Sequence, residues 1–202
     1  MNADLKTDLA APRHSNGLDQ FFSYIKGESH LSILDMGGAS QANISFITGL
    51  GHRLYTEDYC HLVDAAFTHP NPLAAQSDPR QVKPFLDANL AYPANHFDGV
   101  LIWNSLEHLA PLLLAATVDR LYEVTKPRSY LLAFFHADER LRKVPVYSFR
   151  ISSPKTLLLT PREAKQPAQI FNNRALEKMF QKFESVKFFL TRDLLREVIV
   201  KR

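Results

Sequence analysis

Short apolar runs typical of buried strands alternate with segments of helical periodicity along the first two thirds of the chain. The runs "LSILDM" (31–36), "FDGVLIW" (97–103) and "SYLLAFFH" (129–136) are typical of strands in a parallel sheet, which are buried on both faces. "QANISFITGL" (41–50) follows a capping serine, and residues 105–126 form a second helical pattern that is broken at Pro111. This order predicts an α/β fold with helices on both faces of a mostly parallel sheet.

Four further segments complete the predicted sheet. Residues 52–58 read as a strand that ends in two acids, and residues 84–90 ("PFLDANL") are a weaker strand candidate. Residues 185–202 read as strand, turn, strand, a connection too tight for a helical crossover, so the last strand must run antiparallel to its neighbour. We therefore expect a Rossmann-like sheet of seven strands, mostly parallel, with an antiparallel last strand.

Length and composition favour one domain. The 202 residues are 46% hydrophobic, which is enough for one sizeable core. Residues 1–16 are polar, so we expect a flexible segment followed by a single domain over 17–202. With one cysteine, Cys60, a disulfide or a multi-cysteine metal site within the chain is excluded, and we expect no metal. The sequence shows neither a signal-peptide pattern nor an apolar run of about 20 residues, and the expected location is the cytoplasm.

The charges are unevenly distributed. Residues 1–119 carry six Lys and Arg against 13 Asp and Glu, whereas residues 120–202 carry 18 against eight. A basic half can attract an anionic small molecule, an acidic protein or nucleic acid, although scattered surface charge is the simpler explanation. The basic residues are not interleaved with aromatic residues, as they are in a groove that binds single-stranded nucleic acid.

The turn after the first predicted sheet strand, "LDMGGASQ" (34–41), has the place of a nucleotide-binding turn but lacks its full set of glycines. A nicotinamide fingerprint needs Gly-x-Gly-x-x-Gly, and counting from Gly37 the later positions hold Ala39 and Ala42. A P-loop is also absent, because Gly-Lys-Ser/Thr does not occur. A ligand without phosphates, such as S-adenosylmethionine (SAM), tolerates this loss better.

At this point the sequence resembles the class I SAM-dependent methyltransferases. The resemblance is carried by "ILDMGGASQ" (33–41), the acid that ends the second strand, "LDANLAYPANHFDGVLIWNSLEHL" (86–109) and "LYEVTKPRSYLLAFFH" (121–136), in that order. It covers about residues 33 to 136, and the antiparallel last strand also matches the family. The resemblance implies SAM as cofactor and methyl transfer as the activity.

The resemblance also implies roles for individual residues. Asp35 would face the methionyl amino group, and Asp58 would accept hydrogen bonds from both ribose hydroxyls. Asp87 would meet the adenine amino group, and Asn104 would line the methionyl end. The positions so implied to bind SAM are Asp35, Gly37, Gly38, Ala39, Asp58, Asp87, Ala88 and Asn104. The simpler alternative is that Asp35 and Gly37 only turn the chain and cap the helix.

The sequence departs from the family pattern in two places. Ala39 and Gln41 stand where the family usually has glycines, and "KPRS" (126–129) replaces the usual Lys-Pro-Gly-Gly turn. These departures leave open a methyltransferase-like binding or scaffold protein without turnover. A third reading is an NAD(P)-dependent oxidoreductase, against which the failed glycine spacing and the antiparallel last strand both count.

Two histidines are candidate general bases, because an imidazole titrates near neutral pH. His136 ends the strand 129–136 and His108 follows the strand 97–103, so both are expected near the carboxyl edge of the sheet. Either could instead be a structural histidine. Residues 137–173, with a predicted hairpin (144–151 and 155–160) and many basic side chains, are expected to cap the substrate site and favour an anionic small-molecule acceptor. Val144, Val146, Phe149 and residues 157–159 would equally suit a hairpin that covers an apolar edge. The oligomeric state stays open.

Overall fold

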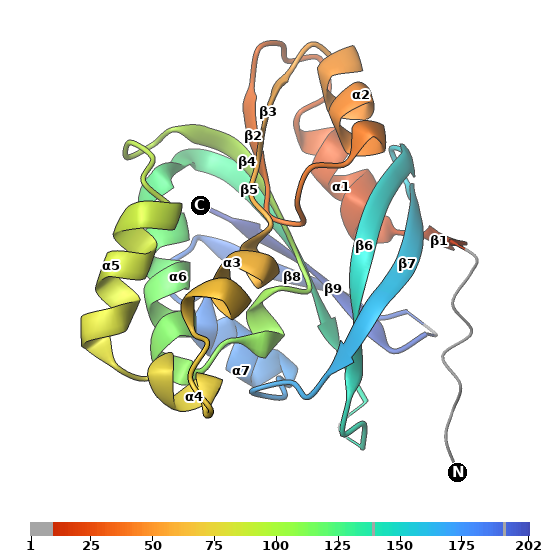
Figure 1. Cartoon of the computed structure of the whole chain (residues 1–202). Helices are drawn as coiled ribbons and strands as arrows, with labels where there is room; N and C mark the ends of the chain where they lie inside the picture. The colour runs from red at the N-terminus through yellow and green to blue at the C-terminus, as the bar shows by residue number, and fades with distance from the viewer. Residues whose placement is uncertain (1–9, 139, 192) are drawn as a thin grey trace.

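The computed structural model describes residues 10–138, 140–191 and 193–202 (Figure 1). A six-stranded sheet forms the centre of the molecule. Its strands, in spatial order, are β3 (Arg53–Thr56), β2 (Ser32–Asp35), β4 (Phe97–Trp103), β5 (Thr125–His136), β9 (Leu195–Lys201) and β8 (Ser185–Phe189). The sequence-based prediction of a Rossmann-like α/β sheet is confirmed.

The strand directions also agree with the prediction. The pairs β3–β2, β2–β4 and β4–β5 are parallel, whereas β9 is antiparallel to both β5 and β8. The predicted number of seven strands is wrong by one. The segment 84–90, expected to be the third strand, belongs to helix α5 (Pro79–Asn89), and among the described residues none between 59 and 96 forms a strand.

Local capping explains why this segment is helical. The side chain of Asp78 accepts a hydrogen bond from the backbone N–H of Arg80, and Pro79 occupies the first helical position, where a missing N–H costs nothing. The helix then buries Val82, Phe85 and Leu86, which share one face at a spacing of three and four residues. The start signal at Asp78 and Pro79 therefore outweighs the apolar run that follows it.

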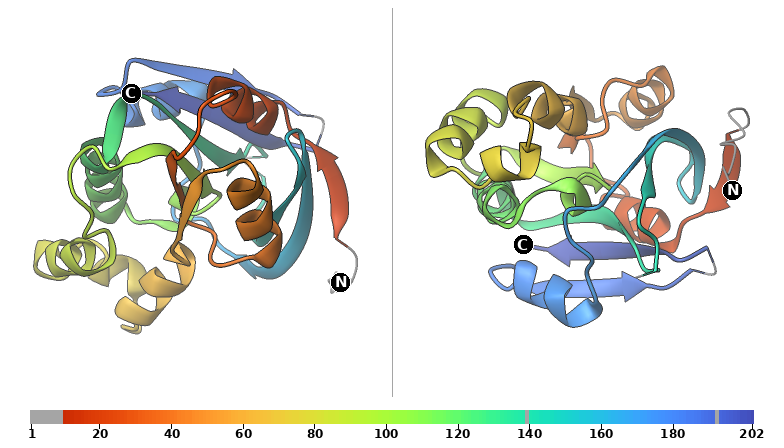
Figure 2. Two further views of the ribbon diagram at one scale, coloured as in Figure 1. Left: turned by 90° about the horizontal axis from the view of Figure 1, so that it is seen from above. Right: turned by 60° about the horizontal axis from the view of Figure 1, so that its bottom comes forward.

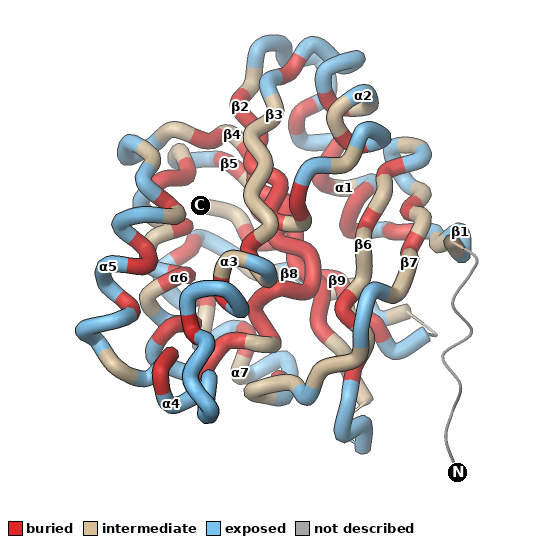
Figure 3. Tube along the Cα trace, in the orientation of Figure 1, coloured by how far each residue is buried: buried red, intermediate tan, exposed pale blue. Residues whose placement is uncertain are grey.

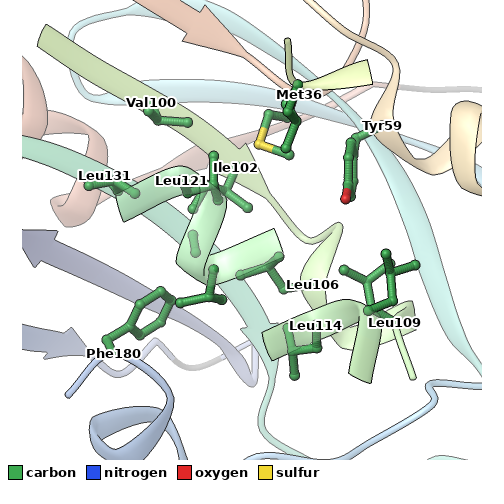
Figure 4. Close-up of a cluster of buried hydrophobic side chains, with 14 of the residues drawn as sticks. Met36, Tyr59, Val100, Ile102, Leu106, Leu109, Leu114, Leu121, Leu131 and Phe180 are labelled. Atoms are coloured by element: carbon green, nitrogen blue, oxygen red, sulfur yellow. The ribbon is translucent and has the colours of Figure 1, made fainter. Parts of the chain in front are cut away.

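One face of the sheet is covered by helices. Along β4 and β5 the side chains of Val100, Ile102 and Leu131 point into this layer, and Figure 4 shows them packed with Leu121 and Phe180. The layer consists of α3 (Tyr59–Ala66), α4 (Pro72–Ala75), α5, α6 (Pro111–Val124) and α7 (Asn173–Met179). Figure 3 shows that the central strands are the most continuously buried part of the chain.

The opposite face is covered by two helices and a second, smaller sheet. Helices α1 (Asn16–Tyr24) and α2 (Gln41–Gly49) lie beside a three-stranded antiparallel sheet in the order β1 (Ala11–His14), β7 (Thr156–Lys165) and β6 (Val144–Ser153) (Figures 1 and 2). We refer to β6 and β7 as the hairpin. Its Phe149 and Ile151 join the apolar cluster that contains Leu101, Trp103 and Leu132 of the central sheet.

The predicted hairpin therefore exists, but much of it is a structural cover for the sheet.

The prediction of a flexible segment over residues 1–16 needs correction where the structure describes it. Residues 11–14 form β1, which pairs with β7, and the side chain of Ser15 caps α1. The rest of the predicted flexible segment, residues 1–9, lies outside the described residues.

A buried ion pair fixes this N-terminal strand to the central sheet. Arg13 pairs with the fully buried Glu197 of β9 and also with Asp193, at 2.6 Å. Glu197 accepts further hydrogen bonds from the Ser15 hydroxyl (3.0 Å) and the Gly17 backbone N–H (2.5 Å). Because a buried carboxylate needs partners for its charge and its oxygens, Glu197 joins β1, the start of α1 and β9 into one unit.

Among the described helices, none is long and apolar enough to cross a membrane.

Gly99 of β4 allows α1 to approach the sheet closely, and its replacement should reveal this. A Cβ at position 99 would lie 2.7 Å from Cζ of Phe21 and 3.0 Å from Cδ1 of Ile33. We expect Gly99→Ala to lower the free energy of unfolding by about 1–3 kcal/mol in chemical denaturation. Gly49→Ala is the control, because no atom lies within 4 Å of its added Cβ and alanine favours a helix by up to about 1 kcal/mol. Equal effects at the two positions would contradict this account.

Candidate functional site

Four of the predicted cofactor residues meet where the parallel strands β2 and β3 end. The Gly38 backbone N–H donates to the Glu57 carbonyl at 3.1 Å, and Gly37 forms a β-bridge with Asp58. Gly38 has φ = +88°, and a Cβ there would lie 3.1 Å from the side chain of Asp58. A glycine is therefore required at this position, and the turn brings Asp35, Gly37, Gly38 and Asp58 together.

The Asp35 carboxylate is fully buried, and both of its oxygens are engaged. Oδ1 accepts from the Gly37 backbone N–H at 2.9 Å and from the Trp103 indole Nε1 at 2.6 Å. Oδ2 accepts from the Asn43 amide at 2.8 Å. Burial raises the pKa of Asp35, and these three donors oppose that rise.

Trp103 lies directly over the turn. A Cβ added to Gly37 would lie 2.6 Å from Cδ1 of the indole, so the ring rests on the glycine backbone. On its other side the indole stacks on Phe149 of the hairpin, with ring centroids 4.7 Å apart and planes inclined by 13°. Trp103 thus joins the turn to the hairpin.

Polar contacts hold the hairpin at the same place. The Asn43 amide donates to the Phe149 carbonyl at 3.0 Å, and its Oδ1 accepts from the Ile151 backbone N–H at 2.8 Å. The Asn104 amide donates to the Pro145 carbonyl at 3.0 Å. The hairpin is therefore bonded both to α2 and to the residue that follows β4.

Asp58 is also engaged within the chain. One oxygen caps helix α3 by accepting from the His61 backbone N–H at 3.2 Å, and the other pairs with Arg162 of β7 at 2.9 Å. Asp35 is likewise engaged, because both of its oxygens accept hydrogen bonds from within the chain. The acids expected to meet the amino group and the ribose of SAM therefore already have partners in this arrangement.

Among the described contacts, Ala39 and Gln41, the departures from the family glycines, do not bond to Asp35 or Asp58, which border the expected SAM site, here called the cleft. Both residues are exposed, and the Gln41 amide turns away to donate to the Ser45 hydroxyl at 3.0 Å. The groups that fill the cleft come instead from Trp103 and the hairpin.

The structure does not bring Asp87 and Ala88 to this site, in contrast to the prediction from the sequence. Both lie in α5, and the Asp87 carboxylate is 63% exposed and paired with Lys83 at 2.6 Å. The expected adenine contact relied on a strand at 84–90, and the helix that replaces this strand carries both residues away.

The two predicted histidines lie on either side of a buried glutamate. His136 Nδ1 is 2.7 Å from Oε1 of Glu107, and the His136 backbone N–H donates to Oε2 at 3.0 Å. His108 Nε2 is 3.8 Å from the same carboxylate, beyond hydrogen-bond distance. Burial lowers the pKa of His108. Glu107 therefore orients His136, whereas neither ring nitrogen of His108 has a hydrogen-bond partner.

His108 lines a cavity of about 390 Å³ between α3, α4, the 3₁₀ turn η1 (Leu106–His108) and the end of β7. Lys143 and Lys165 also line it, together with Asp64, Gln76, Ser105 and Cys60. Burial raises the pKa of the Cys60 thiol to about 11, so this cysteine is a neutral side chain at pH 7. The cavity combines two cations with an unpartnered imidazole.

Sequence reasoning missed the residues that fill the cleft. Trp103 was counted only as the last residue of an apolar strand, and Arg162 only as one of many basic side chains. Asn43 carries no signal in any local pattern, and Phe149 indicates only a hairpin that covers an apolar edge. Their contacts join segments far apart in the chain, such as Asp58 with Arg162, and periodicity does not record such contacts.

Comparison with known proteins agrees with this fold. A family model described as a methyltransferase domain matches residues 4–184, which is most of the chain. No curated protein sequence matches the chain.

Solved methyltransferase structures share the fold at low identity. The chain is similar to a putative type 11 methyltransferase from Sulfolobus solfataricus, with 10% identity, a TM-score of 0.51 and 94% of each chain covered. It is also similar to a SAM-dependent methyltransferase from Archaeoglobus fulgidus, with 13% identity, a TM-score of 0.50 and coverage of 92% of this chain and 91% of that one.

A third similar structure is the 1,6-didemethyltoxoflavin-N1-methyltransferase of Burkholderia thailandensis, which holds S-adenosylhomocysteine (SAH). Here the identity is 10% and the TM-score 0.50, and the match covers 92% of this chain and 76% of that one. At such identities the likeness shows the fold alone. The family match over most of the chain confirms the resemblance found in the sequence, and the chain belongs to the class I SAM-dependent methyltransferases.

Proposed function

We propose that the protein methylates an anionic small molecule, that SAM is the methyl donor, and that the acceptor binds in the cavity lined by Lys143, Lys165 and His108. The observation that carries this proposal is the combination, in one cavity, of two cations and a buried imidazole without a partner. The cavity is next to the predicted donor residues along the chain. Cys60 comes two residues after Asp58, and Ser105 directly follows Asn104.

The lysines supply the attraction for an anion. Lys165 pairs with Asp64 and, at 3.2 Å, with Glu163, so it is held at the cavity wall by carboxylates on two segments. Lys143, from the turn that leads into β6, is exposed beside it. A carboxylate or phosphate of the acceptor would gain charge-assisted hydrogen bonds from both ammonium groups.

His108 is the residue best suited to take a proton from the acceptor. Its side chain is only 9% exposed, and neither ring nitrogen is hydrogen-bonded. Because burial lowers its pKa, the ring is neutral at pH 7 and can accept a proton from a hydroxyl or amine. His136 has a different place, because its Nδ1 is bonded to Glu107 and its ring stacks on Tyr147, with centroids 6.1 Å apart.

SAM supplies a methyl group that is already activated by the sulfonium, so the protein needs mainly to align the acceptor and exclude water. Family membership supports this choice of donor.

One observation favours a second candidate function, a methyltransferase-like binding protein without turnover. The acids expected to hold SAM are all engaged by the chain itself.

Replacing Lys143 tests the proposed acceptor class. We expect SAH to form when the protein is incubated with SAM and a panel of small carboxylates and phosphates. With the best acceptor, Lys143→Gln should raise KM about tenfold, because one charge-assisted hydrogen bond is lost. Lys155→Gln, the same change at the opposite end of the hairpin, should leave KM unchanged. SAH formation only with neutral or cationic acceptors would refute the anionic class, and SAM binding without any turnover would favour the binding protein.

Replacing His108 tests the general base. We expect His108→Gln to lower kcat by at least about 100-fold with little change in KM. Since burial lowers the pKa of His108, the acid limb of the wild-type kcat profile should lie below about pH 6.5 and be absent from the variant. A large loss of kcat in His136→Gln, with His108→Gln near wild type, would assign the role to His136 instead.

A further inference from the structure

We propose that the hairpin gates the cofactor cleft. SAM binds only after the outer half of the hairpin, residues 144–146 and 163–165, moves away from Asp58 and Asn104. The proposal rests on the use of SAM argued above. Its basis is that residues of the hairpin and Trp103 already bond to the side chains expected to bind SAM, namely Asp35, Asp58 and Asn104.

One polar contact of this closed state is the pair between Asp58 and Arg162. It joins the end of β3 to β7 at 2.9 Å, and both side chains are only partly exposed. A ribose hydroxyl that approached this oxygen would meet the Arg162 guanidinium already bound there. Arg162 and a bound ribose therefore compete for the same carboxylate.

The backbone of the hairpin is built to aim Arg162 at this carboxylate. The ladder pairs Val146 with Glu163 and Tyr147 with Pro161, so Arg162 is the extra residue of a β-bulge. A bulge bends its strand and redirects a side chain, and bulges are common beside active sites. The bulge separates the inner half of the hairpin, which contains Phe149 and packs on the sheet, from the outer half. It is thus the natural pivot for an outward movement.

The outer half is attached to the rest of the fold at a small number of points. The Asn104 amide donates to the Pro145 carbonyl at 3.0 Å, Lys165 pairs with Asp64 of α3, and the side chains of Val144 and Val146 are buried. Release of the Asn104 bond and of the Arg162 pair frees two of the predicted cofactor residues at once, and Lys165 must part from Asp64 in the same movement. The inner half keeps its place through Phe149 and Ile151, so the sheet remains covered when the outer half opens.

Trp103 has a reason to leave the turn when SAM binds. Its φ is 58°, in the left-handed region that a non-glycine residue adopts only when its surroundings impose it, and the register of β4 shifts between Leu101 and Trp103. The stacking on Phe149 and the hydrogen bond to Asp35 are the contacts that hold the indole there. A SAM amino group that engaged Asp35 would replace one of these two contacts.

The test measures binding of SAH, which needs no acceptor, by calorimetry. We expect Arg162→Gln to bind SAH about two- to fivefold more tightly than wild type, because the competitor for Asp58 is gone and a partly exposed ion pair of this kind is of that strength. Arg140→Gln is the matched control. It removes the same charge from the same region, where Arg140 pairs only with Asp138 of its own loop among the described contacts.

Spin labels provide the second measurement. In a Cys60→Ser background, labels at Arg142→Cys beyond the outer half and Leu50→Cys at the end of α2 are both on exposed residues. SAH should shift the distance distribution between them if the outer half opens. Binding of SAH with an unchanged distribution, and with equal affinity in Arg162→Gln and wild type, would overturn the gate while leaving SAM use intact. Failure of SAH to bind to any of the variants would overturn both proposals.

Discussion

The buried carboxylate of Asp35 is the interaction on which the site depends. It accepts hydrogen bonds from three different segments: the turn at Gly37, the end of β4 at Trp103, and α2 at Asn43. A carboxylate removed from water requires such partners, and each donor in turn fixes a part of the surroundings. Asp35 also helps to position the hairpin through Asn43. The hairpin backbone accepts a hydrogen bond from the Asn43 amide and donates one to its oxygen.

The side chains that carry the resemblance to methyltransferases are also the ones bonded in the closed cleft. An acid at the end of β2, a glycine turn and an acid at the end of β3 form the part of the fold that the resemblance to methyltransferases predicts for SAM. In this chain, Trp103 and Arg162 satisfy these acids from within. Because Trp103 and Arg162 already lie against the oxygens that SAM is expected to contact, we treat the closed hairpin and a bound SAM as alternative partners of the same carboxylates. The cavity around His108 is lined in part by the same outer half of the hairpin, through Lys165.

The sequence predicted best what depends on local pattern. The apolar runs that became β2, β4 and β5 alternate with helical segments, and the tight connection between β8 and β9 required the antiparallel pairing that is observed. The failure at 84–90 has a local cause, since Asp78 and Pro79 form a helix start that the apolar residues after it concealed. The contacts of Trp103 with Phe149 and of Asp58 with Arg162 had no local signal, because they arise only when the hairpin packs on the sheet.

The central claim is that the hairpin and SAM compete for one cleft, and the single tryptophan of the chain reports on it directly. Trp103 is buried between Gly37 and Phe149, so its fluorescence should be that of an indole shielded from water. The most direct measurement is the emission spectrum during titration with SAH. The account predicts a shift to longer wavelength as the indole leaves the turn, saturating at the same SAH concentration as the heat of binding. Saturable heat of binding with an unchanged emission spectrum would contradict it.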